Sequence, residues 1–178
     1  MIQSGSIRLR PISEDDTDLI LELRNDLKNA ANFFSDPPLY DFGHKKWLAS
    51  LDLNGIYMVI EYVGEKVGTI AITNIDYRHQ KAEYGRIVVK DSYRGKGIAF
   101  TASNLLISYV FHNLPIRKIN LEVFADNIQA VRFYEKLGFE KEGLFKKEYY
   151  KNGTWKDVLR MALFRETWEE KYANSNKN

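Results

Sequence analysis

The sequence contains no cysteine, and only three histidines and four prolines among its 178 residues. The absence of cysteine excludes disulfides, thiolate metal ligands and any reaction intermediate carried on a cysteine. His44, His79 and His112 lie far apart in the sequence and show no metal-ligand spacing. We therefore predict that the protein holds no metal.

Charge and hydropathy argue against two further classes of protein. Charged residues make up 28% of the chain but leave a net charge of only +2, which argues against a broad nucleic-acid-binding surface. No apolar run approaches the roughly 20 residues that span a bilayer, and the first residues lack a basic-then-apolar targeting pattern. We expect a cytoplasmic protein that binds neither nucleic acid nor membrane.

The hydrophobic pattern predicts one domain over residues 1–170 and a polar, frayed tail over residues 171–178. Helices are expected at residues 13–27, 41–54, 97–112 and 127–137, and strands at residues 7–10, 56–62, 66–75, 82–90, 119–124, 140–150 and 154–164. Asp41 is expected to cap the second helix, and Asn54-Gly55 to end it. The apolar run Ile87-Val88-Val89 indicates a strand that is covered on both faces.

The most informative segment is Arg94-Gly95-Lys96-Gly97-Ile98-Ala99, between a predicted strand and a predicted helix. Glycines allow backbone N–H groups to approach a ligand closely, and the helix dipole and the two basic side chains favour a phosphate. The segment therefore predicts a cradle for a phosphorylated cofactor, although it equally suits an ordinary basic turn.

A second strand-helix unit follows, and its turn at Ala125 to Asn127 should lie at the same edge of the sheet as the first turn. Asn127 either caps its helix or bonds to the cofactor. Tyr134 lies two helical turns further on and shares that side of the helix. Its hydroxyl either packs in the core or points toward the reactive end of the cofactor.

The order of these motifs resembles the GNAT superfamily of acetyl-CoA-dependent N-acetyltransferases. The resemblance covers nearly the whole chain and is strongest from Glu83 to Phe139. There, Arg94-x-x-Gly97-x-Ala99 is similar to the pyrophosphate loop of the family, and Asn127-x-x-Ala130-x-x-x-Tyr134-x-x-x-Gly138-Phe139 follows in the same order. The resemblance implies an α/β (α+β) fold: a single domain whose mixed, mostly antiparallel sheet has splayed central strands and about four flanking helices.

The resemblance also implies the roles of individual residues. Acetyl-CoA would be the cosubstrate, and its pantetheine arm would lie beside Ile87, Val88 and Val89 like an added strand. Tyr134 would protonate the departing thiolate. The cofactor-binding residues implied in this way are Ile87, Val88, Val89, Arg94, Gly95, Lys96, Gly97, Ile98, Ala99, Asn127 and Ala130.

Acetyl transfer to an amine requires a base, because a lysine-like amine has a pKa near 10.4 and costs about 4 to 5 kcal/mol to hold neutral at pH 7. Glu83, at the start of a strand, is the predicted base, with His79 in reserve; either side chain equally suits a structural role. The N–H of Val88 is expected to polarise the thioester carbonyl. Because cysteine is absent, we predict direct transfer in a ternary complex.

The acceptor is left open by the sequence. The segments Asn74 to Glu83 and Tyr150 to Asp157 resemble a branch that contains polyamine, amino-sugar and ribosomal-protein N-terminal acetyltransferases. Basic residues that would suit the phosphates of a nucleotide-linked amino sugar are Arg24, Lys28, His44, Lys45 and Lys46. Acidic residues that would suit a polyamine are Glu22, Asp26, Asp36 and Asp41. Both sets equally suit a solvated surface.

We therefore predict an N-acetyltransferase that acts on a primary amine of a small metabolite, either a polyamine or a nucleotide-linked amino sugar. Two alternatives remain open: an acetyltransferase of protein N-termini, of the ribosomal-protein type, and a non-catalytic acyl-CoA-binding module. The resemblance also allows a homodimer.

Overall fold

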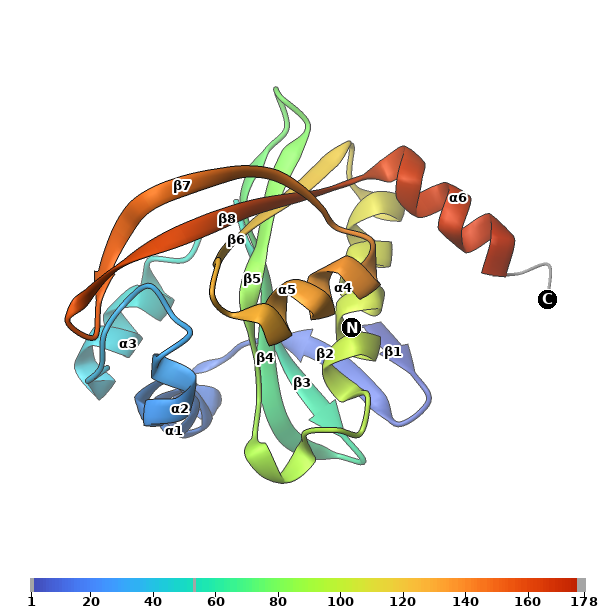
Figure 1. The fold of residues 1–178 in the computed structure, drawn as a ribbon. Coiled ribbons are helices and arrows are strands. Elements are labelled where there is room, and N and C mark those ends of the chain that lie inside the picture. The colour runs from blue at the N-terminus through green and yellow to red at the C-terminus, as the bar shows by residue number, and fades with distance from the viewer. Residues whose placement is uncertain (1, 53, 176–178) are drawn as a thin grey trace.

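An open β-sheet forms the centre of the computed structural model, which describes residues 2–52 and 54–175 (Figure 1). Within these residues, eight strands lie in the order β1-β2-β3-β4-β5-β6-β8-β7. The strands are β1 (Ile2–Ser4), β2 (Ile7–Pro11), β3 (Ile56–Tyr62), β4 (Glu65–Asp76), β5 (Lys81–Val89), β6 (Lys118–Phe124), β7 (Glu140–Lys151) and β8 (Thr154–Phe164). The helices are α1 (Thr17–Asn25), α2 (Leu27–Ala30), α3 (Asp41–Ala49), α4 (Ile98–Asn113), α5 (Ile128–Leu137) and α6 (Arg165–Ser175).

Neighbouring strands of this sheet run antiparallel, except that β5 and β6 run parallel. The predicted mixed, mostly antiparallel sheet is therefore confirmed. β7 and β8 form the expected long hairpin, which arches over the α1–α3 side of the molecule (Figure 1). Its turn at Asn152 and Gly153 has the positive φ angles, 52° and 79°, that favour a tight two-residue hairpin.

The parallel strands β5 and β6 are paired only at their beginnings. The paired residues are Lys81 with Lys118, Ala82 with Ile119, and Glu83 with Asn120. Beyond Glu83, β5 continues beside β4 and β6 continues beside β8, so the edges of β5 and β6 that face each other have no strand partner. The predicted splay of the central strands is confirmed.

Helices cover both faces of the sheet (Figure 1). α4 and α5 pack over a large core that includes Val89, and α1 covers a smaller cluster that includes Val88. Val88 and Val89 point to opposite faces, as the two-residue period of a strand requires, and both are buried. The prediction that this run is covered on both sides is confirmed.

The structure adds two helices to the four that were expected. α1 ends at Asn25, and Asp26 caps the separate single turn α2, because its Oδ1 accepts a hydrogen bond from the Asn29 N–H (2.9 Å). α6 continues to Ser175, so the segment expected to be a frayed tail, from residue 171, begins inside a helix. Residues 176–178 lie outside the described residues.

The helix expected at residues 41–54 is shorter than predicted. α3 begins at Asp41 with Tyr40 as its N-cap residue, and it ends at Ala49. Asp52 accepts a hydrogen bond from the Asn54 N–H through Oδ1 (2.9 Å). Such a side-chain bond stabilises a local turn in competition with the helix, which explains the early end of α3.

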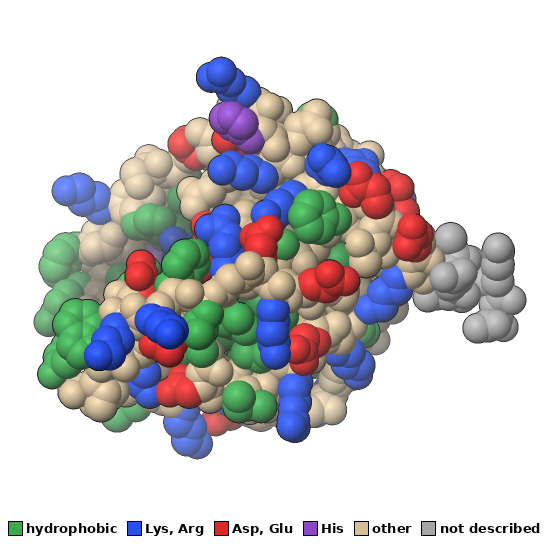
Figure 2. Space-filling model, turned by 45° about the horizontal axis from the view of Figure 1, so that its top comes forward, with side chains coloured by type: hydrophobic (Ala, Val, Ile, Leu, Met, Phe, Trp, Pro, Cys, Tyr) green, Lys and Arg blue, Asp and Glu red, His purple; other side chains and the backbone are tan. Residues whose placement is uncertain are grey.

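The surface mixes charges of both signs. On the face shown in Figure 2, Lys and Arg side chains are interspersed with Asp and Glu side chains, and hydrophobic side chains gather at one end. Exposed aromatic pairs in the structure include Tyr40 with Phe42 and Tyr150 with Trp155. None of the helices in the described residues is long and apolar enough to cross a membrane.

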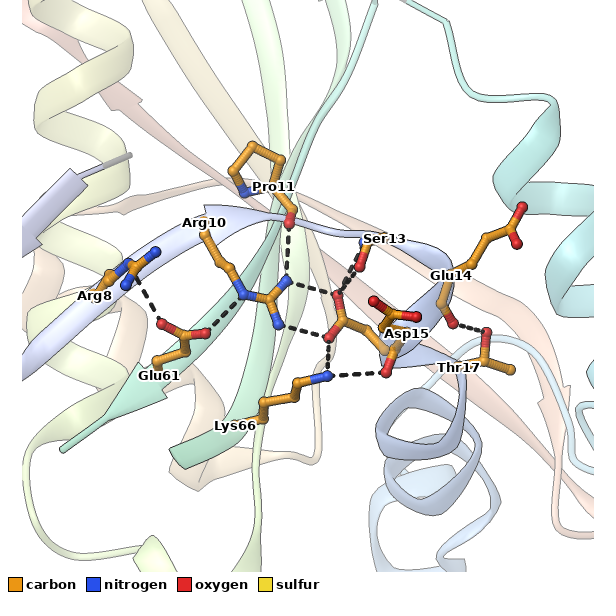
Figure 3. A network of polar contacts seen from close by, with 10 residues as sticks. Arg8, Arg10, Pro11, Ser13, Glu14, Asp15, Thr17, Glu61 and Lys66 are labelled. Carbon is orange, nitrogen blue, oxygen red and sulfur yellow. Dashed lines mark hydrogen bonds and ion pairs between the residues drawn. The ribbon is translucent and has the colours of Figure 1, made fainter. Parts of the chain in front are cut away.

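A network of charged groups connects β2 and the turn before α1 to β3 and β4 (Figure 3). Asp16 is fully buried, and its two oxygens accept hydrogen bonds from Arg10 Nη1 and Nη2 (2.8 and 2.7 Å). Lys66 Nζ lies 2.8 Å from Asp16 Oδ1, and Arg10 Nε lies 2.7 Å from Glu61 Oε1. The Ser13 N–H also donates to Asp16 (2.9 Å). The buried charge is thus fully paired, as burial of a carboxylate requires.

Two opposing effects act on the pKa of Asp16. Burial raises it, but hydrogen bonds from Arg10, Lys66 and the Ser13 N–H together outweigh burial and hold the pKa well below its usual range. A carboxyl group whose pKa is lowered by folding stabilises the fold above its unfolded-state pKa. This stabilisation is lost as the pH falls through the folded-state pKa.

We predict that Asp16→Asn lowers the free energy of unfolding by about 3 kcal/mol near neutral pH, because it removes the negative charge that compensates Arg10 and Lys66. Below about pH 4 the difference between the two proteins should narrow, since Asp16 then becomes protonated in the unfolded wild-type chain, which favours unfolding of the wild type. Urea unfolding at several pH values measures both effects. The neighbouring exposed carboxylate provides a control, Asp15→Asn, which should change little. A difference in the free energy of unfolding that does not vary with pH would contradict the stabilising role of the Asp16 carboxylate.

Candidate active site

A cavity of about 770 Å³ opens where β5 and β6 separate. Its wall is formed by the start of α4, the free edge of β5, the end of β6 and the first part of α5, and residues 32–35 also line it. It brings together both predicted catalytic residues and most predicted cofactor-binding residues. These are Glu83, Ile87, Val88, Val89, Arg94, Gly95, Gly97, Ile98, Ala99, Asn127, Ala130 and Tyr134.

The turn before α4 has the geometry of an anion cradle. Gly95 and Gly97 have φ angles of 78° and 75°, a left-handed conformation that glycine adopts without strain. The N–H groups of residues 95–100 make no hydrogen bond with any described residue, and a Cβ added at either glycine would meet no atom within 4 Å. Free donors in open space at the positive end of a helix dipole suit a phosphate group.

The two basic side chains of this turn occupy different positions. Arg94 lines the cavity, and its guanidinium is held by Asn29 Oδ1 (2.5 Å from Nη2) and by Asp91 Oδ1 (3.1 Å from Nε). Lys96 is not part of the cavity lining, and its ammonium lies over the ring of Tyr93, 4.8 Å from the centroid. Lys96 therefore adds positive charge near the turn without forming the wall of the cavity.

Asn127 is the N-cap of α5. Its Oδ1 accepts a hydrogen bond from the Ala130 N–H (3.1 Å), and its Nδ2 donates to Asn32 Oδ1 (2.8 Å). Of the two roles left open by the sequence, the structure shows the cap. The same side chain connects the loop after α2 to the helix that carries Tyr134.

Tyr134 places a phenol in the wall of the cavity. Its ring makes edge contacts with Tyr84 and Phe139, with centroids 6.0 and 6.1 Å apart, and no hydrogen bond joins its hydroxyl to another described residue. Burial raises the pKa of Tyr134 to about 12. The hydroxyl therefore keeps its proton at neutral pH and remains available to a ligand.

Two carboxylates line the cavity from neighbouring strands. Glu83 of β5 accepts a hydrogen bond from Asn74 Nδ2 through Oε2 (2.8 Å). In Glu122 of β6, burial raises the pKa, the charge of Arg160 lowers it, and the charges of Glu83 and Glu148 raise it again, for a net rise. A carboxylate with a raised pKa is a stronger base, which favours uptake of a proton from an ammonium group.

The sequence predicted Glu83 but missed Glu122. The available signal was a lone acid within the apolar run Ile119–Phe124. His79, the predicted reserve base, does not line the cavity: it is exposed in the turn between β4 and β5, with Nδ1 2.8 Å from Asp76 Oδ2. His79 belongs to that turn.

A second cavity, of about 310 Å³, adjoins the first on the side of the sheet covered by α1 and α3. We call the 770 Å³ space the outer cavity and the 310 Å³ space the inner cavity. Of the charged residues considered for acceptor binding, Arg24 lines both cavities and His44 lines the inner one. The residues of those two sets that line neither cavity are Glu22, Asp26, Lys28, Asp36, Asp41, Lys45 and Lys46.

The fold and the outer cavity define a class of protein. A sheet that opens beside a glycine-rich anion cradle, with a protonated phenol and two carboxylates on the walls, suits acyl transfer from a coenzyme A thioester. The family described as "Acetyltransferase (GNAT) domain" matches residues 9–159, and the chain belongs to this family. The protein is an acetyl-CoA-dependent acetyltransferase, as the resemblance implied.

Individual relatives match from about two thirds to nearly all of the chain. Spermidine N(1)-acetyltransferase of Escherichia coli (strain K12) is 30% identical over 175 residues, which cover 92% of this chain and 89% of that protein. The putative ribosomal N-acetyltransferase YdaF of Bacillus subtilis (strain 168) is 33% identical over 118 residues, which cover 66% and 64%. The structure of spermidine N-acetyltransferase from Vibrio cholerae in complex with CoA and spermine is similar with a TM-score of 0.87 at 28% identity, covering 92% and 98%.

We predict that Gly97→Ala weakens acetyl-CoA binding by about tenfold, because the added methyl group occupies the open space of the cradle and the turn is strained. Isothermal titration calorimetry measures the affinity. Gly64→Ala is a matched control, since Gly64 has a similar φ angle of 81°, with no atom within 4 Å of an added Cβ, in the turn between β3 and β4. Equal loss of affinity in both variants would show that backbone strain alone, not the cradle, is responsible.

Proposed function

We propose that the protein transfers the acetyl group of acetyl-CoA directly to a primary amine of a small molecule, with polyamines as an acceptor class. The observation that carries this proposal is that the anion cradle, Tyr134, Glu83 and Glu122 all line one continuous cavity, the outer cavity. The relatives that are spermidine acetyltransferases support a polyamine acceptor. Two carboxylates in one cavity also suit the ammonium groups of such a molecule.

The cofactor-binding residues would hold acetyl-CoA in two ways. The N–H groups of residues 95–100 and the guanidinium of Arg94 would bind its diphosphate. The free edge of β5 at Ile87, Val88 and Val89 would align its pantetheine arm through backbone hydrogen bonds, since this edge has no strand partner. Val88 stands opposite Thr69 in a hydrogen-bonded position of the β4–β5 pair, so its N–H faces β4. The N–H of Val89 faces the free edge and would polarise the thioester carbonyl in its place.

Three proton transfers would complete the reaction. Glu83 would accept a proton from the bound ammonium, directly or through water, and leave a neutral amine that attacks the carbonyl carbon. As the new C–N bond forms and the C–S bond breaks, Tyr134 would donate its hydroxyl proton to the departing sulfur, and the second proton that the nitrogen loses as the amide forms would restore the phenol. The loss of water that raises the pKa of Tyr134 acts on a thiolate in the same cavity, so donor and acceptor are shifted in the same direction.

We also propose that the protein is cytoplasmic and forms a homodimer, on the basis of the sequence and the family resemblance. Acetylation of a protein N-terminus, the activity that the name of the Bacillus subtilis relative suggests, is the alternative reaction. A peptide acceptor assayed beside spermidine separates the two.

We predict that the protein releases coenzyme A from acetyl-CoA in the presence of spermidine but not in the presence of an N-terminal peptide. We also predict that Tyr134→Phe lowers kcat by about 100-fold with little change in KM for acetyl-CoA. An assay of thiol release measures acceptor specificity and the kinetic constants of the variant. Tyr109→Phe removes a hydroxyl from the exposed face of α4 and should have no effect. Tight acetyl-CoA binding without thiol release from any amine would favour a non-catalytic module. Full activity of Tyr134→Phe would refute the acid role.

We predict that Glu83→Gln lowers kcat/KM for spermidine by about 100-fold near neutral pH, and that the deficit shrinks toward pH 10 as the amine loses its proton without help. A pH profile of kcat/KM tests this. Glu135→Gln, on the exposed side of α5, serves as the control. A normal profile for Glu83→Gln together with a deficit in Glu122→Gln would transfer the role of base to Glu122.

A further inference from the structure

The inner cavity differs in chemistry from the carboxylate-lined end of the outer cavity. Among the described residues, its lining contains no acidic side chain, but it contains two arginines, a histidine and two large aromatic side chains: Arg24, Arg86, His44, Trp47 and Tyr57. The two cavities share Arg24, Ser35, Tyr57 and Arg86, so the arginines stand where one cavity passes into the other.

The two guanidinium groups have no carboxylate partner among the described residues. Arg24 Nη2 donates to Ser35 Oγ (2.5 Å), and its Cζ lies over the ring of Phe33, 4.0 Å from the centroid. Burial, and next the charge of Arg86, lower the pKa of Arg24 to about 10, so the group remains charged at neutral pH. Two like charges close enough to repel would both gain from an anion placed between them.

The backbone of β5 presents Arg86 in an unusual conformation. Thr69 pairs with Val88 and Ala71 with Gly85, so Arg86 and Ile87 stand opposite one residue of β4 in a β-bulge. Arg86 has a φ angle of 53°, which costs energy for a residue with a side chain. Its guanidinium lies 5.1 Å from the ring centroid of Trp47 and 5.6 Å from that of Tyr57.

One further polar group of the inner cavity has no hydrogen-bond partner among the described residues. His44 is only 1% exposed, and its Nε2 makes no hydrogen bond with any described residue. Its ring lies against Trp47, with centroids 5.3 Å apart. A buried nitrogen of this kind costs stability unless a ligand or water bonds to it. The inner cavity is thus lined by two guanidinium groups without a carboxylate partner and by an imidazole nitrogen without a hydrogen-bond partner among the described residues.

We propose that the inner cavity binds an anionic group, and that it gives the enzyme a second class of acceptor: primary amines that also carry a carboxylate or a phosphate. This rests on the proposed function, because the amine must still reach Glu83 and Tyr134 in the outer cavity. An acceptor of this class would place its ammonium near the carboxylates and its anion between Arg24 and Arg86. A polyamine gains nothing from this cavity, since a remote ammonium would meet two guanidinium groups.

Two matched pairs of acceptors test the proposal. L-lysine and 1,5-diaminopentane differ by one carboxylate, and glucosamine 6-phosphate and glucosamine differ by one phosphate. We expect kcat/KM to favour the anionic member of at least one pair by about tenfold, the effect of one charge-assisted hydrogen bond. The pair that shows the preference identifies the anion as carboxylate or phosphate.

Arginine variants connect the preference to the cavity. Arg24→Gln and Arg86→Gln should each bring the ratio of kcat/KM within the preferred pair toward unity, whereas Arg86→Lys should retain part of it. Arg78→Gln, an exposed arginine in the turn between β4 and β5, should leave the ratio unchanged. Since ratios within one variant are compared, a general loss of activity does not mimic the result. Thermal unfolding verifies that each variant is folded.

A binding measurement keeps this inference separate from the proposed reaction. Titration calorimetry with L-lysine, glucosamine 6-phosphate and glucosamine, in the presence of coenzyme A, should show binding of an anionic acceptor that Arg24→Gln weakens. Turnover of spermidine without binding or turnover of either anionic acceptor would overturn the inference and leave the proposed function standing. An anion preference that persists undiminished in both Gln variants would also overturn it.

Discussion

The separation of β5 from β6 after Glu83 is the constraint on which the site depends. In a continuous sheet the edge of β5 would be occupied by hydrogen bonds to β6. The bulge at Arg86 bends and twists β5 away from β6, while β6 continues along β8 on its other edge. The free edge, the anion cradle after β5 and the carboxylates of both strands all face the space that results.

The features that could be predicted from the sequence are local. Alternating apolar residues, the glycines at residues 95 and 97, and the cap at Asn127 each act within one strand or one helical turn, so the sequence pattern and the structure agree closely there. The splay itself was not visible in any local pattern. It came from the resemblance of the whole strand-turn-helix order to a family.

The features that escaped prediction depend on contacts between distant parts of the chain. Glu122 enters the site only because β6 lies across the cavity from β5, and its place in an apolar strand concealed it. Arg24 was a candidate for acceptor binding, but Arg86 was not, and the fold alone brings this residue of β5 close to Arg24 of α1. The position of His79 outside the cavity could not be predicted either, because a loop position does not reveal on which side of the sheet edge the loop turns.

The arrangement of charges also bears on how an amine loses its proton. Carboxylates beside an ammonium attract it, but they stabilise its charged form and so raise its pKa, which opposes the reaction. Guanidinium groups at the junction of the two cavities act in the opposite direction, because like charges favour the neutral amine. In the proposed reaction, Glu83 and Glu122 together with Arg24 and Arg86, which line the same cavity, would combine capture of an amine with release of its proton. Neither set of charges would achieve both alone.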